Sequence, residues 1–147
     1  MEIVDLLKDT ALFRTLKPNE LDLIARSTRL ETFPAGKAII REGRVGAAFF
    51  IIVSGRVEVV KDIDGSSPVV LAYFGPGDFF GEIATVRHLA RSASVRALED
   101  TECLVIWRAD FEGFISHFPE AAEQVEAVAR ERLAAQHNGA WERDNLA

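Results

Sequence analysis

The chain has 147 residues, of which 48% are hydrophobic, so it is long enough and apolar enough to form one domain with a continuous core. Its 17 basic and 23 acidic residues leave a net charge of −6, which argues against a surface that grips phosphate backbones, so we expect no direct nucleic acid binding. The N-terminus lacks the basic region and cleavage site of a secretion signal, and no apolar run approaches the ~20 residues of a membrane span.

Residues 1–29 are predicted to form two short helices. Pro18 stands where the first turn of a helix tolerates proline. Apolar residues recur at helical spacing in both halves of the segment, at Ile3, Leu6 and Leu7 and again at Leu21, Ile24 and Ala25.

Residues 30–107 are rich in β-branched and aromatic residues that are interrupted by glycine, which predicts short strands. In GRVEVVK, Val57 and Val59 alternate with Arg56 and Glu58, as expected for a strand with one face exposed to solvent. The run DIDGSSP at residues 62–68 supplies the turn of a hairpin. Many short antiparallel strands joined by glycine turns are typical of a sandwich or barrel.

The one cysteine of the chain, Cys103, lies in the apolar run CLVIW. A single cysteine excludes an internal disulfide and a thiolate metal cluster, and its apolar neighbours indicate a small core residue. A reduced thiol fits a reducing compartment, so we expect the protein to be cytoplasmic.

Residues 108–137 are predicted to form two amphipathic helices that meet near Pro119. The first carries apolar residues at i, i+3, i+4 and i+7, namely Phe111, Phe114, Ile115 and Phe118. A second apolar stripe follows Pro119 among charged residues. The periodicity is lost after His137, so we expect residues 138–147 to form a flexible tail.

The stretch GEIATVRHL at residues 81–89 is predicted to form a short helical turn that begins near Gly81 and Glu82. The first N–H groups of a helix have no intrahelical partner and carry the positive end of its dipole, which favours an anion. Arg91 offers a planar fork of donors suited to phosphate, and the small residues Ser92 and Ala93 leave their own N–H groups uncovered. These features predict a phosphate-binding site.

Glu82 would repel a phosphate, so it needs a different partner. A carboxylate accepts hydrogen bonds from adjacent sugar hydroxyls, as in dinucleotide-binding folds. An acid followed by Arg91 therefore predicts a nucleotide monophosphate that is held at both its ribose and its phosphate.

The run FGEIATVRHLARSASVRA at residues 80–97 resembles the phosphate-binding cassette of the cyclic nucleotide-binding domain family. The pattern of that family is roughly F-G-E-(L/I/M)-A, a short spacer and (P)-R-x-A-(S/T)-V. Upstream, AGKAIIREG and FFIIVSGRVEVV resemble its strands, and LFRTLKPNELDLIA resembles its entry helices, so the resemblance covers nearly all of residues 10–135. Ala90 stands where many members have proline, which leaves both charged contacts in place.

The resemblance implies one cyclic nucleotide-binding domain over residues 1–137, mainly β with flanking α. The expected fold is an antiparallel β-roll or jelly-roll sandwich at residues 30–107, with N-terminal helices, a short phosphate-cassette helix and two C-terminal helices at residues 108–137.

The resemblance also implies a site for cAMP or cGMP that needs no metal. Glu82 would hold the ribose 2′-hydroxyl and Arg91 the exocyclic phosphate oxygens. The backbone N–H groups expected to supply the other contacts belong to Gly81, Ile83, Ala84, Ser92 and Ala93. The C-terminal helix would cover the base as a lid, with Arg130 and Arg132 as candidate contacts. We favour the adenine nucleotide, although the Ser92 hydroxyl could help to bind a guanine amino group.

Two other classes of function stay open. A structural or protein-interaction domain could keep the fold without the ligand, which Ala90 permits but Glu82 and Arg91 argue against. A jelly-roll metalloenzyme would need a cluster of ligands, whereas the histidines are scattered over different predicted elements, so we expect no enzyme. The three histidines are His88, His117 and His137.

Members of this family attach the domain to an effector such as a DNA-binding helix-turn-helix, a channel or a kinase. About ten residues follow the last predicted helix, which is too few for the two packed helices of a DNA reader. We therefore expect the output to pass to an effector domain or protein partner outside this chain, or through homodimers. The chain is then either part of a longer protein or a stand-alone sensor.

Overall fold

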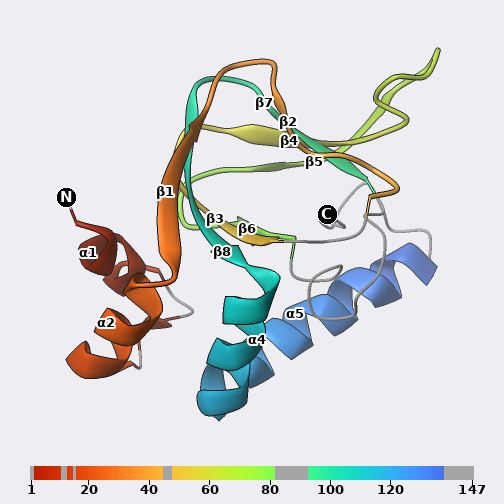
Figure 1. Cartoon of the computed structure of the whole chain (residues 1–147). Helices are drawn as coiled ribbons and strands as arrows, with labels where there is room; N and C mark the ends of the chain where they lie inside the picture. Colours follow the sequence, from red (N-terminus) through yellow and green to blue (C-terminus); the bar gives the residue numbers. More distant parts are fainter. Residues whose placement is uncertain (1, 11–12, 15, 45–47, 82–92, 138–147) are drawn as a thin grey trace.

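The computed structural model describes residues 2–10, 13–14, 16–44, 48–81 and 93–137. In this part of the chain, two four-stranded sheets face each other and helices flank one of them (Figure 1). The first sheet has the order β1-β8-β3-β6, with β1 at Thr28–Phe33, β8 at Thr101–Trp107, β3 at Ala48–Ser54 and β6 at Phe79–Phe80. The second has the order β2-β7-β4-β5, with β2 at Ala38–Ile40, β7 at Ser94–Ala97, β4 at Val57–Lys61 and β5 at Val69–Phe74.

Helices stand before and after the strands in the sequence. Helices α1 at Ile3–Lys8 and α2 at Pro18–Ala25 precede β1, while α4 at Arg108–His117 and α5 at Pro119–His137 follow β8. All pairs of neighbouring strands are antiparallel. The predicted fold class, an antiparallel sandwich with helices at both ends of the chain, is therefore confirmed. The predicted cassette helix falls within residues 82–92, outside the described residues.

Strands β3 and β8 bury both of their faces, because side chains of a strand point alternately to opposite sides. One set lies in the core between the sheets and consists of Phe50, Ile52, Cys103 and Val105. The other set lies against the helices and consists of Phe49, Ile51, Leu104 and Ile106. These two strands thus connect the inside of the sandwich to the helical layer.

Aromatic rings fix α4 to the first sheet and to the segment between α1 and α2. Phe111 of α4 stacks on Phe49 of β3 with ring centroids 4.4 Å apart, and Phe114 meets Phe13 edge-on at 5.1 Å. Val125 of α5 is buried in the same cluster. Ring pairs of this kind add about 0.5–1.5 kcal/mol each to the energy of burial, so α4 is firmly seated.

Cys103 is a fully buried core residue, as predicted. Burial and, to a lesser extent, the negative charge of Glu31 raise the pKa of its thiol to about 12. The thiol is therefore protonated and unreactive at neutral pH.

Glu58 is placed differently from the sequence prediction. The alternation in β4 predicts that Glu58 and Arg56 lie on a solvent-exposed face. Instead, Glu58 is only 5% exposed, lies directly opposite Arg96 of β7 and accepts a hydrogen bond from its Nε at 2.8 Å. Arg56 is exposed and lies over the ring of Tyr73, with its Cζ 4.8 Å from the centroid. The ion pair is what allows a carboxylate to be buried here.

The β segment begins two residues earlier than predicted, at Thr28 rather than Leu30. The buried hydroxyl of Thr28 donates to the Ile24 carbonyl of α2 at 2.8 Å, so the first residue of β1 is bonded to the last turn of the helix. The boundary was missed because threonine favours strands and also makes local hydrogen bonds to backbone groups.

Gly55 makes the tight turn between β3 and β4 and has a φ of 95°. A Cβ atom at this position would lie 2.5 Å from Thr101 Oγ1 and 2.7 Å from the Asp100 carbonyl oxygen. Glycine is thus required here by both conformation and space. The turn at Gly55 joins the end of β3 to the start of β4 at one end of the sandwich. The start of β3 and the end of β4 therefore both lie at the other end, away from Gly55.

Candidate functional site

The segment that carries the predicted cassette is held between two strands of different sheets. Strand β6 lies at the edge of the first sheet beside β3, and β7 lies inside the second sheet between β2 and β4. Gly81 directly follows β6, and Ala93 directly precedes β7. Residues 82–92 therefore connect one sheet to the other. Five predicted site residues lie outside the described residues, namely Glu82, Ile83, Ala84, Arg91 and Ser92.

The N-terminal anchor of this segment is rigidly packed. Phe80 is fully buried and stacks on Phe50 at 5.0 Å and on Phe74 at 6.1 Å. Gly81 is buried and has a φ of 89°, a conformation that glycine adopts without strain. The glycine that the sequence placed before Glu82 is thus required by the backbone.

The C-terminal anchor is held by neighbours on both sides. Ala93 is fully buried, and Ser94 is 1% exposed. Ser94 lies opposite Val60 of β4, and its hydroxyl oxygen accepts the backbone N–H of Glu42 at 3.0 Å. The start of β7 is therefore tied to β4 and to the turn after β2.

Both anchors lie at the same end of the sandwich. Phe50 pairs with Phe80 and with Val105, which brings the start of β3 beside the ends of β6 and β8. Ser94 pairs with Val60, which brings the start of β7 beside the end of β4. This is the end of the sandwich opposite to Gly55.

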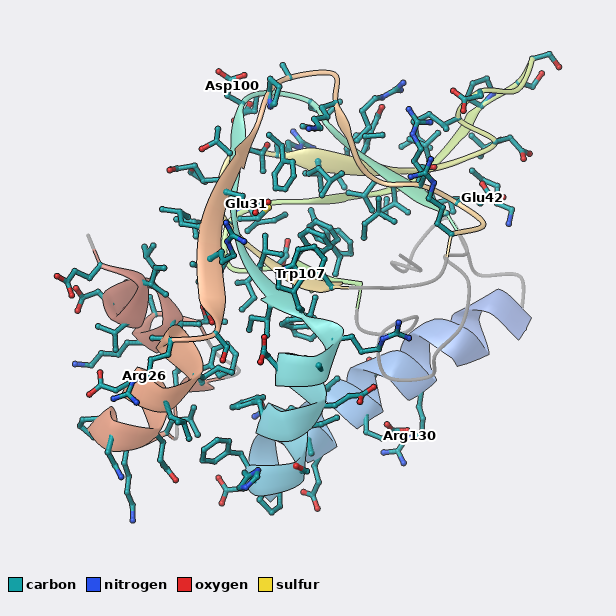
Figure 2. The ribbon with its side chains drawn as sticks, viewed as in Figure 1. Arg26, Glu31, Glu42, Asp100, Trp107 and Arg130 are labelled. Carbon is teal, nitrogen blue, oxygen red and sulfur yellow. The ribbon has the colours of Figure 1, made fainter. Side chains whose placement is uncertain are left out.

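A cavity of about 320 Å³ opens between the sheets on the side of β1 and β2. Its apolar wall is formed by Phe33, Ile40, Ala48, Phe50 and Val105. More exposed side chains also line the cavity: Glu31 and Trp107, both labelled in Figure 2, together with Arg41 and Arg44. A volume near 300 Å³ with apolar walls and a few polar groups is typical of a small-molecule site.

The predicted lid residues are described only in part. Arg130 lies on α5, is exposed and points away from the sheets in Figure 2. The side chain of Arg132 lies outside the described residues. A contact between Arg130 and a base would require α5 to move, so the lid stays a prediction.

Two contacts beside the site were missed by sequence reasoning. The Glu42–Ser94 and Glu58–Arg96 contacts join residues 52 and 38 positions apart. Alternation along a strand shows which residues share a face, but strand register decides which of them meet. The residue types alone carried no signal for these pairs.

Neither metal ligands nor a membrane span are evident in the described residues. No three His, Cys, Asp or Glu side chains in the ranges given above come together as ligands. Among the same residues, no helix is long and apolar enough to cross a bilayer.

Comparison with known proteins agrees with the geometry. The family model of the cyclic nucleotide-binding domain matches residues 30–118, which include both sheets from Leu30 onward and helix α4. The chain belongs to the cyclic nucleotide-binding domain family. This family is a regulatory, non-catalytic kind of domain.

Relatives of this cyclic nucleotide-binding domain have different architectures. The chain is 35% identical over 127 residues to the cyclic AMP receptor protein of Thermus thermophilus, covering 86% of this chain and 59% of the relative. It is 40% identical over 124 residues to a cyclic nucleotide-gated potassium channel of Mesorhizobium japonicum, covering 84% of this chain and 33% of the channel. The crystal structure of the Thermus thermophilus catabolite activator protein superposes with a TM-score of 0.75 at 34% identity, over 87% of this chain and 60% of that one. The chain thus spans about a third to three fifths of these relatives.

Proposed function

We propose that this chain is a sensor domain that binds cAMP and passes on its occupancy through its C-terminal helix. The observation that carries the proposal is the position of the cassette motif. Its two ends, Gly81 and Ala93, are fixed at the end of the sandwich opposite to Gly55, and the family model that matches the chain is that of the cyclic nucleotide-binding domain. The name of the Thermus thermophilus relative, which specifies cyclic AMP, supports adenine as the base.

Each end of the ligand has a proposed partner. The Arg91 guanidinium binds the exocyclic phosphate oxygens, because its planar fork matches two of them. The Glu82 carboxylate accepts the ribose 2′-hydroxyl. The N–H groups that complete the phosphate contacts are proposed to be those of Gly81, Ile83, Ala84, Ser92 and Ala93. The apolar wall of the cavity includes Phe50, which stacks on Phe80 just before the cassette, and this cavity is proposed to give room for the uncharged part of the ligand.

We expect the purified protein to bind cAMP more tightly than linear adenosine monophosphate by at least about tenfold, or 1.4 kcal/mol. The cassette offers donors to one ring-constrained monoanion, whereas the linear phosphate carries more charge and is free to rotate. Isothermal titration calorimetry with both nucleotides measures the difference.

A third titration with cGMP tests the base preference. Binding of cGMP that is tenfold tighter than cAMP would reverse the preference and point to the Ser92 hydroxyl. Equal affinity for cAMP and its linear form would contradict the cassette assignment. Absence of binding to any of the three would favour the alternative, a structural or protein-interaction module of the same fold.

Transmission is proposed to run through α4 and α5. Helix α4 is fixed to β3 by the Phe49–Phe111 stack, and Phe118 separates it from α5, which begins at Pro119, so α5 can change its angle while α4 stays in place. The effector that reads this change is proposed to be a further domain, a protein partner or a second copy in a cytoplasmic homodimer.

We expect saturating cAMP to slow hydrogen exchange in residues 119–136, because a helix that closes over the ligand opens less often. Exchange followed by mass spectrometry, with and without cAMP, measures the change for each peptide. A peptide covering β8 serves as the control, since its protection should change less. Identical exchange of residues 119–136 in both samples would argue against lid closure.

A further inference from the structure

The turn after β2 and the hairpin between β4 and β5 meet beside the start of β7. Glu42 of the turn contacts both the start of β7 and the hairpin. Its backbone N–H donates to the buried Ser94 hydroxyl at 3.0 Å, and its carboxylate Oε1 accepts the Asp62 N–H at 3.0 Å. Its other oxygen, Oε2, lies 3.6 Å from Lys61 Nζ. One residue thus joins three segments that are far apart in the sequence.

A groove separates the turn from the hairpin over much of this region. The groove has a volume of about 600 Å³ and is lined on one side by residues 41–44 and on the other by residues 62–67. A second ion pair crosses the groove between Arg41 Nη1 and Asp64 Oδ2 at 3.1 Å, but the Asp64 side chain is 82% exposed. Exposed pairs contribute little, so the half-buried carboxylate of Glu42 is the stronger link.

The hairpin needs this link because its first turn is strained. Asp62 has a φ of 56°, and it is the only non-glycine residue with a positive φ in the described part of the chain. Its carbonyl oxygen accepts the Gly65 N–H at 2.9 Å, while its own N–H is the group bound by Glu42. A left-handed conformation of a non-glycine residue is held in place only by its surroundings.

The other contact of Glu42 is next to the proposed ligand site. Ser94 follows Ala93, whose N–H is one of the proposed phosphate donors, and both residues are buried. A shift of Ser94 would therefore move the Ala93 N–H. Hydrogen-bond donors must be held within about 0.5 Å of the productive geometry to keep their effect.

We infer that Glu42 is a positioning residue of the nucleotide site: by clamping the hairpin and the start of β7 to one turn, it fixes the C-terminal end of the cassette. The inference rests on the proposed function, because its effect is measured as affinity for cAMP. Glu42 itself does not contact the ligand.

The test uses two substitutions of Glu42 in the full chain. Glu42→Ala removes the acceptor of the Asp62 N–H, and we expect it to weaken cAMP binding about fivefold, mainly through faster dissociation. Glu42→Gln keeps a carbonyl oxygen for the same N–H and loses only the charge facing Lys61, so its affinity should stay within about twofold of wild type. Surface plasmon resonance with immobilised protein gives both rate constants.

Two controls separate positioning from charge and from stability. Asp64→Ala removes one negative charge from the same hairpin and should leave the affinity unchanged. Thr101→Ala removes a buried hydroxyl that donates to the Glu99 carbonyl at 2.8 Å, at the far end of the sandwich. It should lower the urea midpoint of unfolding without weakening cAMP binding.

Each outcome decides a different point. A wild-type protein that does not bind cAMP overturns the proposed function and this inference with it. A wild-type protein that binds, together with Glu42→Ala of unchanged affinity, overturns the inference alone. The inference is also overturned if Thr101→Ala weakens binding as much as Glu42→Ala at a similar loss of stability, or if Glu42→Gln is as weak as Glu42→Ala.

Discussion

Arg91→Leu should weaken cAMP binding by roughly 30-fold to several thousand-fold, which corresponds to ~2–5 kcal/mol. The phosphate is the only full charge on the ligand, and leucine would leave it partly desolvated without a counter-ion. The chain carries a net charge of −6, so its overall field does not attract the anionic ligand. Calorimetric titration of the variant, with competition against a fluorescent analogue for the weak range, measures the loss.

Arg87→Leu is the matched control, because it makes the same change four residues earlier in the same segment. The sequence predicts that Arg87 lies on a solvated helix face. The affinity of the Arg87→Leu variant for cAMP should therefore stay within about twofold of wild type. If Arg91→Leu bound cAMP as well as Arg87→Leu does, Arg91 would not be the phosphate ligand. Circular dichroism of both variants checks that the fold is retained.

Most of the fold could be predicted from the sequence because its signals are local. The alternation of Val57 and Val59 places them in the core, and both are fully buried. The spacing of Phe111 and Phe114 predicts a helix with one apolar face, and both residues pack against the first sheet. Glycine marks turns, as at Gly55, where no other residue would fit.

The pairing of charged residues could not be predicted in the same way. Glu58 is one of the polar residues that alternate with valine along β4. It is nevertheless buried, because Arg96 lies opposite it on β7. Thr28 is predicted to lie in the segment before the strands, but its hydroxyl bonds to the last turn of α2 and its backbone begins β1. The Glu58–Arg96 contact depends on strand register, which residue types do not encode. The Thr28 contact is local, and it was missed because threonine favours strands and also bonds to nearby backbone groups.

The candidate site, too, was predictable from the sequence only in part. The motif around Glu82 and Arg91 was recognisable because its residue types and spacing match a known cassette. The structure adds the two anchors, Gly81 with its positive φ and the buried Ala93, and it shows that they lie at one end of the sandwich. The roles of Glu82 and Arg91 themselves remain proposals that the two substitution experiments test.

Glu82→Gln should be the milder of the two site variants, with a loss of about 1–2 kcal/mol, or roughly fivefold to thirtyfold in affinity for cAMP. Glutamine keeps an acceptor at similar reach for the ribose 2′-hydroxyl but gives up the charge that strengthens the hydrogen bond. It also removes a repulsion toward the nearby phosphate, which offsets part of the loss. The same calorimetric titration measures the difference from Arg91→Leu.

The sugar gives an independent check of this assignment through a double-mutant cycle between protein and ligand. Wild type should bind 2′-deoxy cAMP clearly more weakly than cAMP, because the Glu82 carboxylate then loses its partner. The Glu82→Gln variant should distinguish the two ligands much less, since the charge-assisted part of the hydrogen bond is already gone. Arg91→Leu should keep the full preference for the 2′-hydroxyl, because its defect lies at the phosphate. If Glu82→Gln were as damaging as Arg91→Leu, or if it discriminated against the deoxy ligand as strongly as wild type, then Glu82 would not be the residue that holds the ribose.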